Sequence, residues 1–434
     1  MTTATVEKTG EKTVDKAGSR VGITYAARDI PANWQAGKLG DFIELKRGYD
    51  LPKAERSQGP YPLVSSSGVS DWLAEPMVHG PGVVTGRYGT IGQVYFVEQD
   101  FWPLNTTLYV RDFKGNDPRF ISYFLKTVDF LAYSDKAAVP GVNRNDLHKA
   151  SALMPALAEQ KRITEFLGTL DDRITLLRET NATLEVIAQA LFKSWFVDFD
   201  PVHAKQQGIA PVGMDEATVA LFPSEFEESK LGLVPKSWPV KTLEDLLVLQ
   251  RGFDLPAQDR IPGDFPIIAA SGLSGTHAEA RAKGPGVITG RSGILGRVFL
   301  ELDDYWPLNT TLWIKQFRAA TPCYAYELLS QIDLKSFNAG SAVPSLNRNH
   351  VHGLPYLIPP RACIEAYEEI ALQLHQRARI NNLQAQTLAT LRDTLLPRLI
   401  SGQLRLPPAP SEHVETVANP KHVAPATSTV ELQT

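Results

Sequence analysis

The chain repeats its own sequence at a fixed distance of 204 residues. Trp34 recurs as Trp238, and the run Trp-Pro-Leu-Asn-Thr-Thr-Leu occurs twice at the same separation. Between residues 34–155, the first copy, and residues 238–359, the second copy, about 48 of 122 positions are identical without a gap, too many for a shared fold alone. Two like halves present two like surfaces, so such a molecule suits a target that itself has two similar parts.

Length and composition indicate the class of protein. A chain of 434 residues predicts roughly two to four domains, of which the repeat supplies two. No apolar run approaches the roughly 20 residues that a membrane span needs, so we expect a soluble protein without a membrane segment. The N-terminal segment carries no secretion signal, and the only cysteines, Cys323 and Cys363, lack metal-ligand or redox spacing. These features predict a cytoplasmic protein.

The charge of the chain argues against a sequence-blind nucleic-acid binder, which normally has a basic surplus. The formal net charge is −4. The first copy contains 13 basic and 13 acidic side chains, and the second copy contains 11 of each. If these copies bind DNA, local groups must do so, or a partner must supply the positive field.

Each copy contains strand and helix patterns and is followed by a long helical stretch. Short β-branched and aromatic runs broken by Gly and Pro, such as Val94–Val97 and its counterpart Val298–Leu300, indicate half-buried strands. Shorter amphipathic helices are predicted at 119–133 and 324–337. We therefore predict an α+β fold with two homologous mixed α/β domains.

The two long stretches have the apolar spacing of coiled coils. In residues 159–196, apolar side chains recur every three or four positions, interrupted by Asn181, and the helix would be roughly 57 Å long. The second stretch keeps this spacing more weakly, from Tyr367 to Leu399. We expect the two helices to pack antiparallel about a pseudo-twofold axis and to separate the two domains. A buried Asn181 would then fix their register.

These patterns divide the chain into seven segments. The connector between the halves contains Gly, Pro and acidic residues that suit an irregular segment, and the composition after Leu406 is typical of disorder. The predicted boundaries are 1–29 for a flexible N-terminal tail, 30–155 for the first domain, 156–200 for the first long helix, 201–234 for the connector, 235–359 for the second domain, 360–405 for the second long helix and 406–434 for a disordered C-terminal tail.

Familiar catalytic motifs are missing from the sequence. The chain has no Gly-x-x-x-x-Gly-Lys-Ser/Thr nucleotide loop, no His-Glu-x-x-His zinc motif and no Gly-x-Ser-x-Gly nucleophile elbow. Among nine histidines, only His148 and His352 occupy repeated positions, which does not favour a metal site. We predict no catalytic residues, no metal and no cofactor.

The repeated polar residues lie in loops. Arg87 and Arg291 each follow a glycine, where the backbone can approach a ligand and a guanidinium can fork onto guanine or a phosphate; the alternative is an arginine buried against a carboxylate. Asn can match adenine and Thr can meet a thymine methyl group, although Thr also serves turns and strands structurally. Asn before a short helix can cap it or set its N-terminus against a phosphate. The candidate DNA-binding residues are Arg87, Asn105, Thr106, Asn143, Arg144, Arg291, Asn309, Thr310, Asn347 and Arg348.

Three features together resemble the specificity subunits of type I restriction-modification systems. The first is the paired Gly-Arg-x-Gly-x-x-Gly element at 86–92 and 290–296. The second is the sequence Pro-x-x-x-Glu-Gln-x-x-Ile at 155–163, where the first long helix is predicted to begin. The third is the pair of sequences that end the two helices, at 191–201 and 391–402.

The resemblance implies that each globular domain is a target recognition domain that reads one half of a bipartite double-stranded DNA site. It also implies that the long helices act as a spacer and dock two methylation subunits, with restriction subunits as further partners. Adenine methylation and ATP-dependent cleavage would belong to these partner chains, so the protein would be non-catalytic by itself. After Pro360 the second copy lacks the Glu-Gln pair, so docking at the two helices need not be equivalent.

The likeness of the two copies carries a further expectation. We predict similar half-sites, so that the full target approximates an interrupted palindrome. Two other functions remain open, namely a coiled-coil scaffold that binds no DNA and a self-contained nuclease or methyltransferase. The chain has no Asp/Asn-Pro-Pro-aromatic loop for amino-methyl transfer, which counts against the methyltransferase. Protein that bound no DNA even with its methylation subunit would favour the scaffold.

Overall fold

The computed structural model describes residues 31, 33–134, 141–211, 213–340 and 343–407. The chain divides into two compact units, one comprising Met1–Thr169 with Leu391–Thr434 and the other comprising Leu170–Thr390. The predicted tail at 1–29 and nearly all of the predicted tail at 406–434 lie outside the described residues. Each unit contains one copy of the repeat, together with parts of two long helices.

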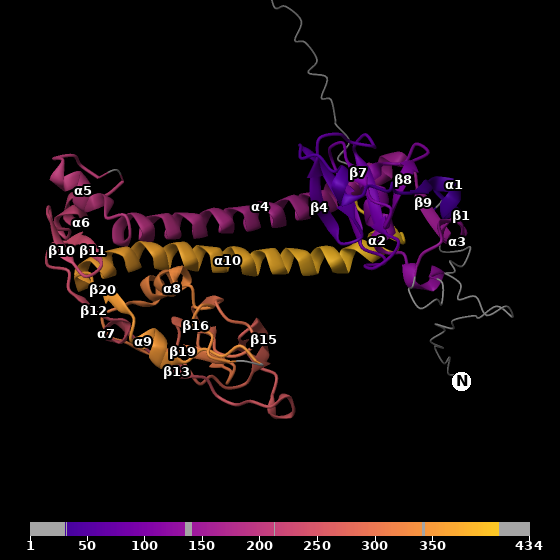
Figure 1. The fold of residues 1–434 in the computed structure, drawn as a ribbon. Helices are drawn as coiled ribbons and strands as arrows, with labels where there is room; N and C mark the ends of the chain where they lie inside the picture. Colours follow the sequence, from indigo (N-terminus) through magenta and orange to yellow (C-terminus); the bar gives the residue numbers. More distant parts are fainter. Residues whose placement is uncertain (1–30, 32, 135–140, 212, 341–342, 408–434) are drawn as a thin grey trace, which may run out of the picture. The chain divides into compact units, whose positions relative to one another are not determined.

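The first copy folds into three small sheets with short helices between them (Figure 1). The strand orders are β2-β8-β5-β6, β4-β3-β7 and β1-β9. The elements are β1 Trp34–Lys38, α1 Leu39–Phe42, β2 Glu44–Arg47, η1 Lys53–Glu55, β3 Tyr61–Ser65, β4 Gly68–Leu73, β5 Gly82–Gly86, β6 Val94–Val97, β7 Trp102–Pro103, β8 Thr107–Asp112, α2 Pro118–Lys126, η2 Phe130–Tyr133, α3 Arg144–Leu147 and β9 Ser151–Pro155.

The four-stranded sheet of the first copy is covered by helix α2. Strand β5 lies between β8 and β6 and is buried along its whole length, which fits its run of small and β-branched residues. Helix α2 packs on β5 and β6. Asp117 caps this helix by accepting a hydrogen bond from the backbone N–H of Phe120 at 2.7 Å, and Pro118 occupies its first position. The helix predicted at 119–133 ends earlier than expected, at Lys126, and a separate 3₁₀ turn, η2, follows it.

The second copy repeats this architecture strand for strand. Its strand orders are β13-β19-β16-β17, β15-β14-β18 and β12-β20. In the central sheets, Val84 lies opposite Tyr109 in the first copy and Ile288 lies opposite Trp313 in the second, at the same separation of 204 residues. The elements are β12 Val240–Thr242, α7 Leu243–Leu246, β13 Leu247–Arg251, η3 Ala257–Asp259, β14 Phe265–Ala269, β15 Gly272–His277, β16 Gly286–Gly290, β17 Val298–Glu301, β18 Trp306–Pro307, β19 Thr311–Phe317, α8 Pro322–Gln331, α9 Arg348–His352 and β20 Pro355–Leu357.

The segment between the halves is ordered, so the expectation of an irregular connector is wrong. It forms α5 Asp200–Gln206, α6 Glu216–Ala220 and a hairpin of β10 Phe226–Ser229 and β11 Gly232–Pro235. The physical reason is its few apolar side chains, because Phe222 is buried and its ring lies 5.5 Å from that of Trp195.

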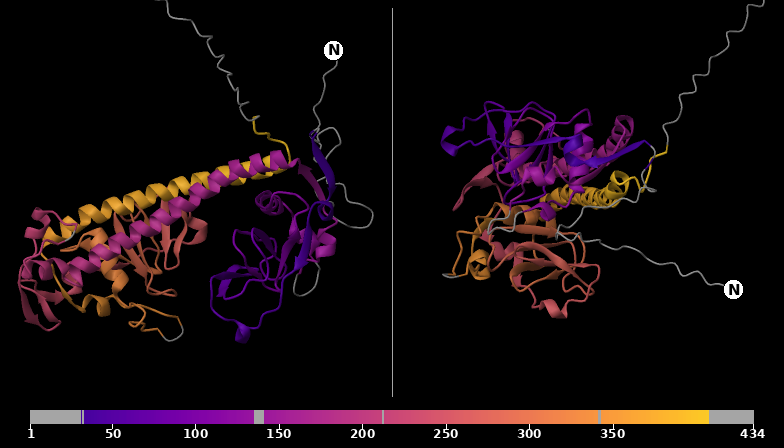
Figure 2. Two further views of the ribbon diagram at one scale, coloured as in Figure 1. Left: turned by 90° about the horizontal axis from the view of Figure 1, so that it is seen from above. Right: turned by 90° about the vertical axis from the view of Figure 1, so that its right-hand side faces the viewer.

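Two 40-residue helices, α4 Leu157–Phe196 and α10 Arg361–Ile400, lie side by side within the second unit (Figures 1 and 2). Ile174 and Leu177 of α4 pack with Ala385 of α10. Further along α4, the carbonyl oxygen of Ala188 accepts a hydrogen bond from the hydroxyl of Tyr367 at 3.2 Å. Because later residues of α4 meet earlier residues of α10, the helices run antiparallel, and the predicted coiled-coil pairing is confirmed in this unit.

A cluster of three asparagines interrupts the apolar seam between these helices. Asn181 Nδ2 donates to the carbonyl oxygen of Ala378 at 3.0 Å and to Asn382 Oδ1 at 2.8 Å. Asn381 Nδ2 donates to Asn181 Oδ1 at 2.9 Å. The side chains of Asn181 and Asn381 are buried, with exposed fractions of 7% and 1%. A shift of either helix along its axis would break these hydrogen bonds and leave buried amides without partners.

The Glu-Gln pair at the start of α4 joins this helix to the first domain. Gln160 is 1% exposed, and its Oε1 accepts a hydrogen bond from the backbone N–H of Asp117 at 2.9 Å. Its Nε2 donates to the carbonyl oxygen of Pro155 at 2.8 Å and to Asn116 Oδ1 at 2.7 Å. Glu159 accepts a hydrogen bond from Trp34 Nε1 at 3.0 Å. Both residues of the sequence motif are therefore used inside the protein's own fold.

The second copy makes the same joint with different side chains. Apolar Ile364 occupies the position that corresponds to Gln160 and is fully buried. One turn later, the carboxylate of Glu368 accepts hydrogen bonds from the backbone N–H groups of Cys323 at 2.9 Å and Tyr324 at 3.3 Å, at the start of α8. A carboxylate is favoured there because the first N–H groups of a helix lack partners within the helix. The missing Glu-Gln pair is thus compensated within the joint.

One ionisable group is deeply buried in the second unit. Glu327 of α8 is 2% exposed, and its Oε1 lies 4.0 Å from Nε2 of His375 on α10. Burial, together with the smaller effect of the nearby carboxylate of Glu185, raises the pKa of Glu327 to about 7. Burial also lowers the pKa of His375. Both shifts favour the neutral forms of these side chains in the folded state.

Candidate nucleic-acid interface

A cavity of about 510 Å³ opens at one edge of the central sheet of the first copy. Four cationic side chains line it, those of Lys46, Arg47, Arg87 and Arg144. Asp50 is the one acidic residue among its lining residues. The fold therefore gathers positive charge locally in a copy that has no basic surplus, which is the condition that DNA binding by this chain requires.

Sheet topology explains why these residues meet. Strands β2 and β5 are both antiparallel to β8, so they run parallel to each other and end at the same edge. Lys46 and Arg47 are the last residues of β2, and Arg87 directly follows β5. Arg144 begins the short helix α3, which packs against β2. Residues distant in sequence thus converge through strand pairing.

Two of the lining residues, Arg47 and Asp50, belong to a polar network that recurs in the second copy. In the first copy, Arg47 Nη2 binds Asp50 at 3.1 Å, and the side-chain amide of Asn105 donates to the same carboxylate. In the second copy, Arg251 Nη2 binds Asp254 at 3.1 Å, and the side-chain amide of Asn309 donates to Asp254. The two predicted asparagines therefore hold the carboxylate that orients an arginine.

The turn that carries the predicted arginine is fixed by its backbone. The N–H groups of Arg87 and Tyr88 both donate to the carbonyl oxygen of Thr106, at 2.9 and 3.2 Å. The N–H of Val142 donates to the carbonyl oxygen of Arg87 at 3.0 Å. Thr106 thus contributes through its backbone, and its side-chain hydroxyl is buried. The guanidinium of Arg87 lies over the ring of Tyr88, with Cζ 4.4 Å from the ring centroid.

The second copy keeps the same backbone frame. The N–H groups of Arg291 and Ser292 donate to the carbonyl oxygen of Thr310 at 2.8 and 3.1 Å, and the N–H of Leu346 donates to that of Arg291 at 2.8 Å. Thr310 Oγ1 also accepts a hydrogen bond from the N–H of Ala270 at 3.2 Å. Both predicted threonines therefore support the arginine turn structurally.

The predicted Asn-Arg pairs begin the short helices α3 and α9. Asn143 Oδ1 accepts a hydrogen bond from the N–H of Asn145 at 2.9 Å, and Asn347 caps α9 in the same way. Arg144 lines the cavity, whereas Arg348 Nη1 donates to the carbonyl oxygen of Leu249 at 3.4 Å. Capping therefore accounts for both asparagines.

The structure brings only some of the predicted site residues of the first copy to the cavity. Arg87, Asn143 and Arg144 line it directly, whereas Asn105 contributes through Asp50 and Thr106 through its backbone. Sequence reasoning missed further lining residues, because their proximity depends on strand pairing. A signal for Arg47 existed in the repeated Arg-Gly-x-Asp sequence at 47–50 and 251–254. The lining residues missed in the first copy include Lys46, Arg47, Tyr49 and Tyr88.

Lys46 is oriented by two tyrosines. Its Nζ lies 3.1 Å from the hydroxyl of Tyr49, which lies 2.9 Å from the hydroxyl of Tyr109. The hydrogen bond with Tyr109 lowers the pKa of Tyr49, and the bond from Lys46 adds to this effect. Burial raises the pKa of Tyr109. The second copy has Gln250, Phe253 and Trp313 at these three positions, so this polar chain belongs to the first copy.

The repeated histidines fix the helix next to the cavity. His148 Nε2 accepts a hydrogen bond from the N–H of Leu45 at 2.9 Å, and His352 Nε2 accepts one from that of Leu249 at 2.8 Å. An accepting nitrogen requires the neutral ring. Burial lowers the pKa of both histidines, which favours this form.

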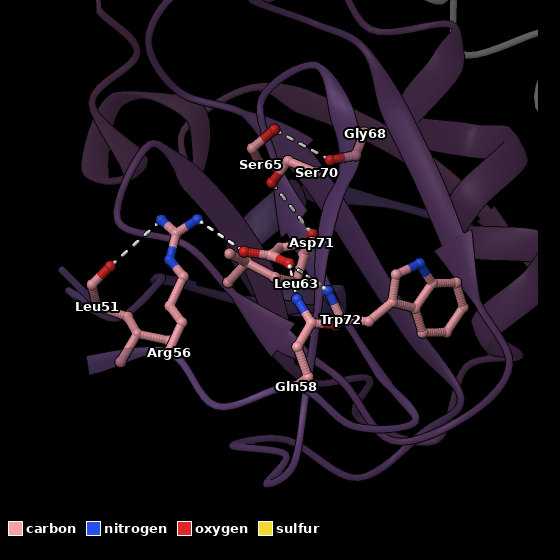
Figure 3. Close-up of polar contacts among 9 residues, drawn as sticks. All are labelled: Leu51, Arg56, Gln58, Leu63, Ser65, Gly68, Ser70, Asp71 and Trp72. Carbon is pink, nitrogen blue, oxygen red and sulfur yellow. Dashed lines mark hydrogen bonds and ion pairs between the residues drawn. The ribbon is translucent and has the colours of Figure 1, made fainter. Parts of the chain in front are cut away.

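In the first copy, an ion pair that sequence reasoning also missed joins Arg56, which follows η1, to Asp71 of β4 (Figure 3). Arg56 Nη1 lies 3.2 Å from Asp71 Oδ2, and the N–H of Trp72 donates to Asp71 Oδ1 at 2.9 Å. These interactions, the Trp72 amide first, lower the pKa of Asp71. Trp72 points away from Arg56 and is 47% exposed. The second copy has Gly275 and Thr276 here, so the hairpins differ in an otherwise similar frame.

The described residues contain neither a metal-binding cluster nor a membrane-spanning helix. No group of three or more His, Cys, Asp or Glu side chains in this part of the chain is placed to hold a metal ion. No helix among the described residues is long and apolar enough to cross a membrane.

The chain is similar to known proteins of one kind. A family model described as the type I restriction modification DNA specificity domain matches residues 31–186. The specificity subunit of the type I restriction enzyme HindI from Haemophilus influenzae is 24% identical over 390 residues, which cover 72% of this chain and 84% of that relative. The MjaIX specificity subunit from Methanocaldococcus jannaschii is 22% identical over 434 residues, covering 87% of this chain and 95% of that relative.

A solved structure shares the fold. The crystal structure of a type I restriction-modification S subunit from M. genitalium matches with a TM-score of 0.55 at 18% identity, covering 85% of this chain and 96% of that one. The predicted α+β architecture with long helices is thereby confirmed. The sequence motifs, the family model and the two relatives agree: residues 31–186 match the type I DNA specificity domain, and most of the chain is similar to the specificity subunits of type I restriction-modification systems.

Proposed function

We propose that the chain is the DNA-binding specificity subunit of a type I restriction-modification complex, and that each copy reads one half of a bipartite double-stranded DNA site. The observation that carries this proposal is the cavity at the sheet edge, where four cations and the amide of Asn143 meet. Arginine and lysine bind phosphates, and arginine also forms a bidentate hydrogen bond with guanine in the major groove. The local cluster supplies the positive field that the net charge of −4 does not.

Two of the three arginines that line the cavity, Arg87 and Arg144, have different proposed roles. Arg87 reads a base, because its backbone is fixed on both sides and its guanidinium is held over an aromatic ring. Arg144 neutralises a phosphate, because it is exposed at the start of α3. Asn105, Thr106 and Asn143 act by holding this frame, and the second copy uses Arg291, Asn309, Thr310, Asn347 and Arg348 in the corresponding positions.

For the remaining segments we propose the boundaries expected from the sequence. We propose recognition domains at 30–155 and 235–359, spacer helices at 156–200 and 360–405, and a connector at 201–234. Two methylation subunits would dock on the spacer helices, with restriction subunits added where the system cleaves DNA, all in the cytoplasm. Exposed apolar side chains outside the helix seam support docking. Examples are Leu176 (51%), Val186 (62%), Ile380 (48%) and Leu383 (52%).

Adenine methylation provides the decisive test of this function. Single-molecule sequencing of modified bases in genomic DNA, with and without the gene, should show loss of methylation at a bipartite motif with similar half-sites. Unrelated half-sites would contradict the proposed similarity of the two readers. Unchanged methylation, together with no DNA binding by the purified complex with its methylation subunits, would favour a scaffold instead.

Residue roles can be separated by binding assays on the same complex. Arg144→Ala should weaken binding to all duplexes about equally and reduce the slope of log affinity against log salt by about 1. Arg87→Ala should instead reduce the discrimination between target and altered half-site by roughly tenfold to hundredfold. Equal effects of the two variants on target and non-target DNA would refute the assignment of base reading to Arg87.

A further inference from the structure

The two copies hold their equivalent arginines in different ways, although their backbones match. Three backbone hydrogen bonds fix the turn in each copy, up to the bond from Val142 or Leu346, and their lengths agree within about 0.2 Å between the copies. In the first copy, the guanidinium of Arg87 lies over the Tyr88 ring. In the second copy, Arg291 Nη1 donates to the carbonyl oxygen of Asn309 at 3.3 Å. The difference therefore arises from the side chains around the turn.

The side chain next to each arginine is matched by the residue opposite it. Tyr88 forms a β-bridge with Gly141, and the corresponding residues Ser292 and Ser345 form the same bridge. A Cβ atom at Gly141 would lie 2.2 Å from Cε1 of Tyr88, closer than carbon atoms can approach. A ring at position 88 thus requires glycine at 141, whereas serine at 292 is accompanied by serine at 345. The two positions have changed together between copies.

The difference between the Tyr88–Gly141 and Ser292–Ser345 pairs changes which N–H groups of each arginine are available to a DNA base. Stacking uses the face of a guanidinium and leaves the N–H groups at its edge for a ligand, in a fixed plane. Reading guanine requires two such N–H groups in one plane, directed at O6 and N7. Arg291 instead donates one of its N–H groups to a carbonyl oxygen of its own chain. The guanidinium of Arg87 in the first copy is therefore better preorganised than that of Arg291 for a bidentate hydrogen bond with guanine.

We propose that the pair Tyr88–Gly141 sets Arg87 to require guanine at one position of its half-site, and that Ser292–Ser345 leaves Arg291 without this requirement. The two half-sites are then alike except at this position, where the second accepts other bases. This inference rests on the proposed DNA-reading function, which it refines by naming the side chains that distinguish the two readers.

Exchange of the pairs between copies tests the proposal. The full chain is produced with its methylation subunits in a host without adenine methylation, and the methylated motif is sequenced. The wild-type motif should contain guanine in one half-site and a relaxed position at the equivalent place in the other. Y88S/G141S should relax the first half-site, with a roughly tenfold to hundredfold loss of preference for guanine. The reciprocal S292Y/S345G should give the second half-site a guanine requirement.

Single variants and a matched exchange act as controls. G141S alone should lower the thermal midpoint, and Y88S should restore it, because the clash needs both side chains. Lys46→Gln, which also makes the first copy resemble the second at a lining position, should weaken binding without changing the required base. Identical wild-type half-sites, or unchanged motifs in both folded exchange variants, would overturn the proposal. A base change caused by Lys46→Gln alone would also overturn it. Absence of any motif that depends on the gene would instead refute the proposed function.

Discussion

Replacement of Asn181 by leucine should destabilise the helix pair, although it makes the seam more apolar. Leucine has as many side-chain heavy atoms as asparagine and the same branching at Cγ, so the shape is similar, although its two methyl groups occupy more volume. The variant loses three hydrogen bonds, each with a net contribution of about 1 kcal/mol, and leaves the buried amide of Asn381 unpaired, which costs about 1–3 kcal/mol more. Burial of a leucine side chain returns roughly 1.5–3 kcal/mol. The net loss should be about 1–4 kcal/mol.

The double variant N181L/N381L separates this explanation from simple loss of polar contacts. Both buried amides are then gone, so no buried amide is left unpaired and two leucines extend the seam. We expect it to be more stable than either single variant by about 2 kcal/mol or more, a coupling that a double-mutant cycle measures.

Urea denaturation of the full chain, followed by far-ultraviolet circular dichroism, is the appropriate assay. Asn382→Ala is the matched control, because it removes one hydrogen bond at an exposed position and should cost less than about 1 kcal/mol. An N181L variant at least as stable as the wild type would refute the reasoning. So would a double variant no more stable than the single variants.

Three further predictions concern buried polar groups. Gln160→Leu should lower the free energy of unfolding by about 1–3 kcal/mol, measured by urea denaturation, because buried partners such as the N–H of Asp117 lose their hydrogen bonds; an unchanged midpoint would contradict its role in the joint. The pKa of His148 and of His352 is lowered from 6.5 in the folded state. Their contribution to stability is therefore complete above pH 6.5 and is lost as the pH falls below it. The thermal midpoint of the wild type should drop below pH 6.5, and that of His148→Gln should drop less steeply. The pKa of Glu327 is raised from 4.5 to about 7, so its contribution to stability is complete below pH 4.5 and is lost as the pH rises through about 7. Glu327→Gln should therefore be more stable than the wild type at pH 8, by on the order of 2–3 kcal/mol, and this difference should vanish near pH 4.5. An equal gain in stability at both pH values would exclude ionisation as the cause.

Features that depend on local sequence were predictable. The 204-residue repeat predicted a common architecture for the two copies, and the apolar spacing predicted the long helices. Both signals can be read along the sequence without knowing which residues meet in space. Capping by Asn143 and Asn347 was one of the two roles expected from their place before a helical turn, and the structure shows it. The connector was misjudged because a few buried side chains, such as Phe222, order a segment whose overall composition is polar.

Features that depend on distant contacts were not predictable in the same way. Nothing near Gly141 in the sequence indicates that a tyrosine ring 53 positions earlier occupies the space of a Cβ atom. The Arg47–Asp50–Asn105 network likewise requires the pairing of β2 with β8 and the turn before β8. The motif at Glu159 and Gln160 was visible in the sequence, but its role in joining helix to domain appeared only from its hydrogen-bond partners.

The joint between each domain and its helix determines where recognition modules can be exchanged. A chimaera cut at Pro155 would transplant the first domain without Glu159 and Gln160, and the acceptor helix would offer Cys363 and Ile364 to Trp34 and Asp117 instead. A cut after the second turn of the helix carries the whole joint with its domain. Modules with new specificities should therefore be spliced inside the helices, although the sheets end several residues earlier.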